Sequence, residues 1–525
     1  PPSSNRRQRQ MCIRDRLVLL PAAGALLVAI LPKGRDEMVM PVAAGISMLP
    51  LAVALFILWE FSTEDGAAFQ FSEAVNWYEP WGIGWNVGID GISLLLIALT
   101  AVLFPISIVA SASVKKDVKL YMVSMLLLET GLLGVFVSLD LLLFFVFFEM
   151  TLIPMYFLIG IWGSENRVYA AVKFFLYTAL GSALLLTGII ALAIIHGDNA
   201  GSISFAFQDL SELALSSNAQ LWLFLGFGAA FAIKVPLFPF HTWLPDAHTE
   251  APTAGSVILA GVLLKLGTYG FVRFNLTLFP EATVRLAPWL GALAVVGIIY
   301  GAAVAIVQPD VKRLVAYSSV SHLGFIVLGT FALTSQGLQG GVIQMVNHGL
   351  TTGALFLLIG MIYDRRHTRQ ISDYGGLSSV MPLFAGIFLF MAFASIGLPG
   401  LNGFIGEFKI LLGSWLAWPV LAILAASGVV LAAIYLLWAY ERMFTGPVTN
   451  EANKGLKDLS VREISILVPL AALIVFLGVY PKPALDRIEP AVESIIERIE
   501  EATDYESPEF GRILDVQEVA AEDNE

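Results

Sequence analysis

The chain has 525 residues, of which 57% are hydrophobic and 14% are charged, and its formal net charge is −12. Soluble domains contain roughly 45–50% apolar and about 25% charged residues, so the composition excludes an ordinary soluble protein. It is typical of a chain that crosses a membrane many times, with a lipid bilayer around it and no nucleic-acid partner.

Long apolar stretches recur along the chain, and many reach the ~20 residues that a helix needs to cross a bilayer. We predict an all-α polytopic membrane protein with about fourteen transmembrane helices. The expected limits are 17–32, 38–61, 90–112, 119–138, 140–162, 167–195, 220–245, 251–275, 286–308, 311–333, 337–363, 377–413, 417–443 and 461–481.

The predicted helices indicate an internal organisation. Helices 1–3 (17–112) precede two five-helix units, helices 4–8 (119–275) and helices 9–13 (286–443). Because five is odd, the second unit is expected to be inverted relative to the first, as in many secondary transporters. Helix 14 (461–481) is followed by an external segment, 482–525.

The fourth helix of each unit is interrupted. Helix 7 contains Lys234-Val235-Pro236-Leu237-Phe238-Pro239, and helix 12 contains Gly397-Leu398-Pro399-Gly400. Proline removes a backbone donor and clashes with the preceding turn. The freed backbone groups are tolerated at membrane depth only against protein or a wet cavity, so we interpret the paired breaks as marks of a transport path.

Six ionisable side chains stand near the middle of apolar stretches: Glu149, Lys234, Lys265, His322, His348 and Glu407. A charge at mid-bilayer costs roughly 2.5–3.5 kcal/mol even on lenient insertion scales, so each one needs an explanation. Carboxylates, ammonium groups and imidazoles can together exchange protons near neutral pH once they are buried. We therefore predict a proton relay.

Structural explanations compete with this one. Lysines 234 and 265 and Glu407 could form static buried ion pairs, and the two histidines could be satisfied packing residues within their polar neighbourhoods. Two weaker relay candidates are Lys173, which could instead snorkel to the interface, and Glu129, which could pair with a lysine or be structural. Asp140, at a helix boundary, is expected to be a cap.

Positive charges in the connections predict the orientation. Lysine and arginine concentrate in the odd-numbered loops, which are therefore expected to be cytoplasmic, so both termini face outward.

Residues 1–16 carry five arginines and contradict this pattern, and we interpret them as a non-native or disordered leader. The only cysteine, Cys12, lies in this leader, so we expect no iron–sulfur cluster, thiolate zinc site or disulfide in the rest.

Two polar segments have less certain roles. His241, Asp246, His248 and Glu250, between helices 7 and 8, could gather protons, but we favour helix capping. In the tail, Pro490 is expected to open an amphipathic helix that grips a neighbouring subunit through an isoleucine-rich face, while the acidic residues 501–525 are expected to be loose.

Several long motifs resemble those of the antiporter-like membrane subunits of respiratory complex I. They include His241-Thr242-Trp243-Leu244-Pro245-Asp246-Ala247-His248, Phe147-Phe148-Glu149-Met150, Asp310-Val311-Lys312-Arg313 and Leu398-Pro399-Gly400-Leu401-Asn402-Gly403-Phe404-Ile405-Gly406-Glu407. The resemblance covers roughly residues 85–480. One departure from most of the family is Glu407, where related subunits and cation/proton antiporters typically place a lysine.

The resemblance implies a function. It implies proton translocation, with Glu149 and Lys234 as the pair of a first half-channel, Lys265 as the central link, and His322, His348 and Glu407 as the exit half. It also implies a bacterial inner membrane location and other membrane-arm subunits as partners. FMN, iron–sulfur clusters and quinone are expected on those partner subunits, and no cofactor or metal is expected on this chain. A multisubunit cation/proton antiporter and a membrane-bound hydrogenase subunit remain alternatives.

Overall fold

The computed structural model describes residues 4–32, 34 and 36–508. The described helices and strands, in chain order, are α1 (Ser4–Ile30), α2 (Asp36–Glu60), β1 (Gln70–Tyr78), η1 (Glu79–Trp81), β2 (Ile83–Ile89), α3 (Gly91–Ala110), η2 (Ser111–Ser113), α4 (Val118–Val137), α5 (Leu141–Met150), α6 (Leu152–Trp162), α7 (Arg167–Ala200), α8 (Phe207–Ser211), α9 (Ser217–Lys234), α10 (Trp243–Glu250), α11 (Thr253–Ile258), η3 (Leu259–Leu263), α12 (Lys265–Gly270), η4 (Phe271–Asn275), α13 (Leu276–Leu278), α14 (Pro280–Ile306), α15 (Val311–Phe331), α16 (Ser335–Arg366), η5 (Ile371–Asp373), α17 (Leu377–Val380), α18 (Pro382–Ile396), α19 (Asn402–Ala417), α20 (Pro419–Phe444), η6 (Glu451–Asn453), α21 (Val461–Val479) and α22 (Lys482–Ala502).

Eleven helical stretches among the described residues are long and apolar enough to cross a membrane. They correspond to eleven of the fourteen predicted spans. The other three are different: the apolar part of α1 is short, α9 ends at the first predicted break, and the span predicted at 377–413 is divided into α17, α18 and α19. The protein is thus a helical membrane protein, while the total of fourteen spans and the inversion of the two units stay predictions.

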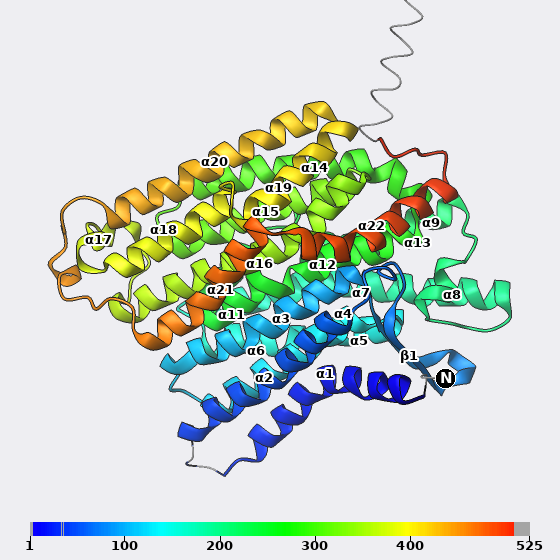
Figure 1. Cartoon of the computed structure of the whole chain (residues 1–525), viewed down its shortest axis with the longest axis horizontal. Helices are drawn as coiled ribbons and strands as arrows, with labels where there is room; N and C mark the ends of the chain where they lie inside the picture. The colour runs from blue at the N-terminus through cyan, green and yellow to red at the C-terminus, as the bar shows by residue number, and fades with distance from the viewer. Residues whose placement is uncertain (1–3, 33, 35, 509–525) are drawn as a thin grey trace, which may run out of the picture.

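The long helices run between two chemically different ends (Figure 1). One end carries the loops with Lys115, Lys116, Lys312 and Arg369, and we call it the basic end. At the opposite end lie the β1–β2 hairpin, α8 and α22, which gather on the right-hand side of Figure 1. We call it the hairpin end.

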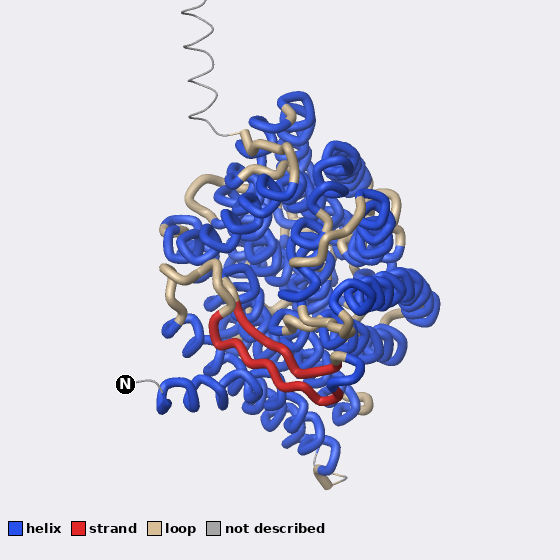
Figure 2. Tube along the Cα trace, turned by 90° about the vertical axis from the view of Figure 1, so that its right-hand side faces the viewer, coloured by secondary structure: helices blue, strands red, loops and turns tan. Residues whose placement is uncertain are grey.

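The hairpin corrects the prediction that all secondary structure is helical. Strands β1 and β2 pair antiparallel, from Gln70 opposite Ile89 to Tyr78 opposite Ile83, and lie across the end of the bundle in Figure 2. The segment is too short and too polar to span a bilayer, and its alternating pattern of side chains suits a half-exposed strand. It joins α2 to α3, where the sequence analysis expected only a loop.

The C-terminal helix also differs from its prediction. Helix α22 begins at Lys482 rather than at Pro490, which lies inside the helix. Proline residues at positions 481 and 483 fix the backbone angle that starts a helix, and they explain the earlier start. The apolar face with Val492, Ile495 and Ile499 is buried against helices of this same chain, including α3 and α16. Contact of this helix with a neighbour stays a prediction.

At the N-terminus, residues 4–16 form the first part of α1. That residues 1–16 are a non-native or disordered leader stays a prediction. In the tail, residues 509–525 of the predicted loose segment lie outside the described residues.

Helix α16 lies at the centre of the bundle, where it packs against α3, α11, α15, α18, α19 and α21. Every residue from Gly337 to Ile362 is buried. Because glutamine, asparagine and histidine occur within this buried helix, their polar groups must find partners on the surrounding helices rather than in water.

Candidate functional site

Four of the six predicted relay residues form one continuous row. Lys265 Nζ lies 2.8 Å from His348 Nδ1, and the ring of His348 lies 5.8 Å, centroid to centroid, from the ring of His322. His322 Nδ1 in turn lies 2.9 Å from Glu407 Oε1. The four side chains come from α12, α16, α15 and α19, and each is at most 4% exposed.

A polar shell surrounds the Glu407 end of this row. Gln344 Nε2 donates a hydrogen bond of 3.1 Å to the same carboxylate oxygen that faces His322. On the other edge of the His322 ring, Nε2 lies 3.3 Å from the Tyr435 hydroxyl and 3.4 Å from Ser395 Oγ. These contacts fix the orientation of the His322 imidazole relative to the Glu407 carboxylate, as hydrogen-bond networks do in a water-free protein interior.

Tyr435 and Ser395 are functional candidates that the sequence analysis missed. A tyrosine or serine in an apolar helix usually indicates packing or a bond to the helix backbone, so neither stands out. The signal that could have found them is position: Ser395 lies two residues before the predicted break at Gly397, and Tyr435 lies at mid-span of α20.

The break between α18 and α19 brings backbone close to Glu407. Gly397 ends α18 with a φ of +83°, a conformation that favours glycine, and its amide hydrogen bonds to Phe393 O. A Cβ added to Gly397 would lie 3.1 Å from Glu407 Oε2. The predicted break is therefore present, and its glycine leaves room for the carboxylate.

The helix around Lys265 has an irregularity that was not predicted. Two π-helical segments, η3 and η4, flank the short α12 that begins at this lysine. Lys265 Nζ donates a hydrogen bond to the Ala260 carbonyl within η3. π-Bulges are rare and frequently occur at functional sites, and here the wider turn offers the ammonium group a backbone acceptor.

Glu149 and Lys234 face each other less directly than predicted. Lys234 Nζ, at the end of α9, lies 4.7 Å from the centre of the Phe148 ring, and the Glu149 carboxylate accepts a hydrogen bond from Ser182 on α7. The charges of Glu149 and Lys234 interact electrostatically. Between these two described residues there is no ion pair within 4 Å, so the predicted pair is in a separated state.

The two weaker relay candidates have other partners. Lys173 Nζ forms an ion pair of 2.7 Å with Asp246 at the basic end, where Arg313 approaches the same carboxylate to 3.5 Å. Glu129 is fully buried and accepts a hydrogen bond of 2.9 Å from Ser47 on α2. Its second oxygen, Oε2, has no partner among the described residues. The sequence left two alternatives for Glu129, an ion pair with a lysine or a structural role. Among the described residues, no ion pair of Glu129 with a lysine is found.

Fewer residues of the polar segment between α9 and α11 cap helices than predicted. Asp246 engages in the ion pairs with Lys173 and Arg313, so the capping prediction is wrong for this residue. Glu250 does accept a bond of 3.0 Å from the backbone amide of Asn166, which immediately precedes α7. Asp140, by contrast, is confirmed as a cap, because its carboxylate accepts from the Leu143 amide at 2.8 Å.

The histidines of this segment are buried without hydrogen bonds that would fix them. His248 is 0% exposed and stacks on Phe356 at 4.8 Å, and both of its ring nitrogens lack partners among the described residues. It lies within electrostatic reach of both Lys265 and Lys312. A buried imidazole without hydrogen-bond partners has lost its hydration without compensation, which makes His248 a candidate for a functional role.

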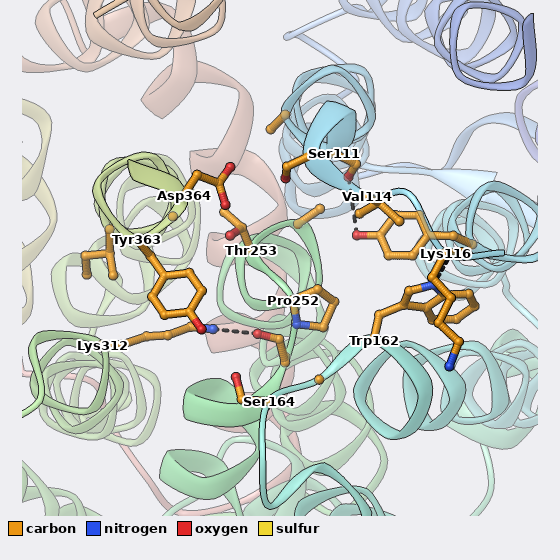
Figure 3. A pocket seen from close by; sticks show the side chains of 18 of the residues that line it. Ser111, Val114, Lys116, Trp162, Ser164, Pro252, Thr253, Lys312, Tyr363 and Asp364 are labelled. Atoms are coloured by element: carbon orange, nitrogen blue, oxygen red, sulfur yellow. Dashed lines mark hydrogen bonds between the residues drawn. The ribbon is translucent and has the colours of Figure 1, made fainter. Parts of the chain in front are cut away.

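A cavity of about 430 Å³ opens at the basic end (Figure 3). Its wall combines charged and hydroxyl groups, including Lys312, Asp364, Tyr363 and Ser164, which Figure 3 shows arranged around the opening. Lys312 Nζ donates to the Ala251 carbonyl at 2.5 Å on the floor of the cavity. The cavity therefore reaches the segment that carries His248.

Among the described residues, no group of three or more histidine, cysteine, aspartate or glutamate side chains could hold a metal ion. The groups of the row contact one another and nearby carbonyl, amide and hydroxyl groups.

Comparison with known proteins identifies the family. Residues 138–434 match the family described as NADH:quinone oxidoreductase/Mrp antiporter, TM. The chain is 44% identical over 492 residues to NADH-quinone oxidoreductase subunit M of Rhodobacter capsulatus, an alignment that covers 92% of this chain and 96% of that protein. It is 43% identical over 483 residues to NADH-ubiquinone oxidoreductase chain 4 of Marchantia polymorpha, with coverage of 92% and 96%.

Solved structures agree with this relationship. A chain of respiratory complex I from Thermus thermophilus with bound NADH has a TM-score of 0.84 and 33% identity, and the match covers 93% of this chain and 99% of that one. A chain of the Mrp complex from Dietzia sp. DQ12-45-1b has a TM-score of 0.80 at 21% identity, which shows a shared fold alone. The chain belongs to the subunit M family of NADH:quinone oxidoreductase, the antiporter-like proton-translocating membrane subunits of complex I.

Proposed function

We propose that this chain conducts protons along the row Lys265–His348–His322–Glu407 and that Glu149 and Lys234 form the switching pair that feeds it. The observation that carries the proposal is the continuity of the row. Two of its three steps are contacts of 2.8 and 2.9 Å between titratable atoms. The third, between the two imidazoles, is a ring separation of 5.8 Å that one water or a small rotation bridges.

The composition of the row favours protons over metal cations. Sodium and other hard cations need several oxygen ligands, whereas the row offers an ammonium group, two imidazoles and a single carboxylate. An ammonium group also repels a passing cation. These groups therefore suit proton conduction better than transport of a metal ion.

The pair Glu149 and Lys234 supplies a switch. In the described state the carboxylate bonds to Ser182 and the ammonium group lies over Phe148, so the two charges are apart. When they approach, each stabilises the charged form of the other, and when they separate, Lys234 releases its proton more readily. Movement between the close and the separated states would determine when a proton is delivered to Lys265.

Proton entry is best placed at the basic end. The cavity there reaches Lys312, and the unpartnered His248 lies within electrostatic reach of both Lys312 and Lys265. We assign His248 to the step between cavity and row. The positive-inside rule places this end in the cytoplasm of a bacterial cell, with the hairpin end and both termini outside.

The redox reaction belongs to partner subunits. The side chains of the row carry no electrons, and the relatives at 44% and 43% identity are named as parts of an NADH-quinone and an NADH-ubiquinone oxidoreductase. We therefore place this chain in the membrane arm of such a complex, beside related antiporter-like subunits. NADH oxidation by FMN and iron–sulfur clusters, and quinone reduction, take place on the partners.

Interruption of the row tests the proposal. His348→Gln keeps an acceptor for Lys265 but cannot carry a proton, so in liposomes containing the whole complex proton uptake and coupled NADH oxidation should fall together, several-fold or more. His196→Gln is the matched control, because His196 lies on α7 and bonds to Ser202 O away from the row. Unchanged pumping in a fully assembled His348→Gln complex would refute the path through the row.

A further inference from the structure

An apolar groove of about 290 Å³ lies between α2, α3, α16, α21 and α22. Along α3 and α16 its lining residues lie nearer the hairpin end than those of the basic-end cavity. Leu55, Ala98, Val102, Leu350 and Phe476 are among its lining residues. All lining side chains are apolar except that of Arg487, which belongs to α22.

The exposure pattern of α3 shows that the groove is open. From Gly91 to Ile108 this helix is buried except at Leu95, Ala98 and Val102, which are only partly buried. Their spacing of three and four residues places them on one face of the helix, and all three line the groove. Because α2, α3, α16 and α21 are all candidate membrane spans, this opening lies at the depth of the lipid hydrocarbon.

Arg487 lies at the end of the groove that is nearest the membrane surface on the hairpin side. Two of its guanidinium nitrogens donate to backbone carbonyls, those of Pro483 at 2.6 Å and Leu58 at 3.2 Å. Its third nitrogen, Nε, is buried and has no hydrogen-bond partner among the described residues. The nearby ends of α2 and α21, at Glu60 and Val479, place this guanidinium at the level of lipid headgroups.

We propose that the groove is a phospholipid site, in which one acyl chain lies along Ala98 and Val102 and the phosphate meets Arg487. A hydrocarbon chain matches a groove without polar side chains at membrane depth. The Arg487 side chain is only partly buried, and a guanidinium binds a phosphate oxygen through a charge-assisted hydrogen bond. The occupant is thus amphiphilic, with its anionic group at the surface and its apolar part below.

The site lies directly behind the proton-carrying row. Val346 and Leu350 of α16 face the groove, while His348 of the same helix faces Lys265. Leu99, which also lines the groove, packs against Gly349, since a Cβ at Gly349 would meet the Leu99 side chain at 2.7 Å. The acyl chain would therefore support the helix segment that positions His348.

Photolabelling of the whole complex tests this proposal. The complex is reconstituted with phosphatidylglycerol that carries a diazirine near the middle of one acyl chain, and labelled residues are mapped after irradiation. We expect labels on the segments around Ala98, Leu350 and Leu473. Ala98→Leu and Ala98→Trp, which fill the groove to different extents, should progressively reduce labelling there. Leu424→Trp, at a 44% exposed position of α20, is the control and should leave it unchanged.

Arg487→Gln tests the headgroup contact separately. Loss of one charge-assisted hydrogen bond should weaken labelling by about tenfold at limiting lipid, without changing which residues are labelled. Labelling spread evenly over the bundle surface, or labelling that survives Ala98→Trp in an assembled complex, would overturn the site. Crosslinks from the groove to a neighbouring subunit, with no lipid label, would show that protein fills it.

Discussion

His322 Nδ1 lies 2.9 Å from Glu407 Oε1, although the two residues are 85 positions apart in the chain and belong to different helices. The same carboxylate oxygen accepts from Gln344 at 3.1 Å. The far side of the imidazole meets Tyr435 and Ser395, so the histidine has a possible proton partner on each edge. This junction couples the broken helix to the centre of the bundle.

Glu407→Gln should strongly impair proton pumping. The amide keeps the shape and a hydrogen-bond acceptor for the partners of Glu407, but it cannot be protonated and released during turnover. Proton uptake and NADH oxidation by liposomes containing the complex measure the effect, and Glu441→Gln, at an exposed position of α20, is the control. Full coupled activity in Glu407→Gln would make this carboxylate structural. Glu407→Lys would then show whether the lysine of related subunits can replace it.

Glu149→Gln should lower pumping and coupled quinone reduction together while assembly stays intact. The substitution removes the negative charge that interacts with Lys234 and keeps a group that can bond to Ser182. Assembly is checked by gel filtration of the purified complex before activity is measured. Near-normal pumping in an assembled variant would remove Glu149 from the switch.

Gly397→Ala should reduce activity through backbone strain and crowding. The residue has a φ of +83°, which costs an L side chain roughly 1–2 kcal/mol, and the new methyl group would lie 3.1 Å from Glu407 Oε2. Gly386→Ala is the matched control, because a Cβ there meets nothing within 4 Å. We expect reduced pumping and a lower melting temperature only for Gly397→Ala, and equal behaviour of the two variants would contradict the close approach at the break.

The orientation can be measured at the C-terminal segment. A protease site or an accessible label placed near Asp504 should be reached from the periplasmic side of intact cells, because the basic end is expected in the cytoplasm. A site in the loop near Lys454, between α20 and α21, should be reached only from the cytoplasm. Access in the opposite pattern would overturn the assigned orientation.

Much of the site was predictable because buried charges are conspicuous in apolar sequence. Proline and glycine at mid-span predicted the breaks at Lys234 and Gly397. The candidate relay residues were predicted from their charge. Their order in space was not predictable from spacing alone, since Lys265 and His348 are separated by 83 positions and meet only through helix packing. Tyr435 and the π-helical turns beside Lys265 give no signal in composition or periodicity.

The fold was less predictable where short-range signals competed. The hairpin at 70–89 lies between two predicted spans, and its apolar residues are too interspersed with polar residues and glycine to form the long apolar run on which the span prediction relied. Pro490 indicated a helix start, but tertiary packing of Ile488 and Val492 extends the helix through that proline. The apolar face of α22 is thus buried against this chain.

A double-mutant measurement tests the central claim most directly. If Lys265, His348, His322 and Glu407 form one path in series, one block already stops the flow, and a second block adds nothing. The rates of proton uptake and of NADH oxidation are each compared for His348→Gln, Glu407→Gln and the double variant in the same liposomes. We predict that the double variant pumps as slowly as the slower single variant. Losses that multiply in the double variant would show that the two residues act independently and would contradict a single proton path.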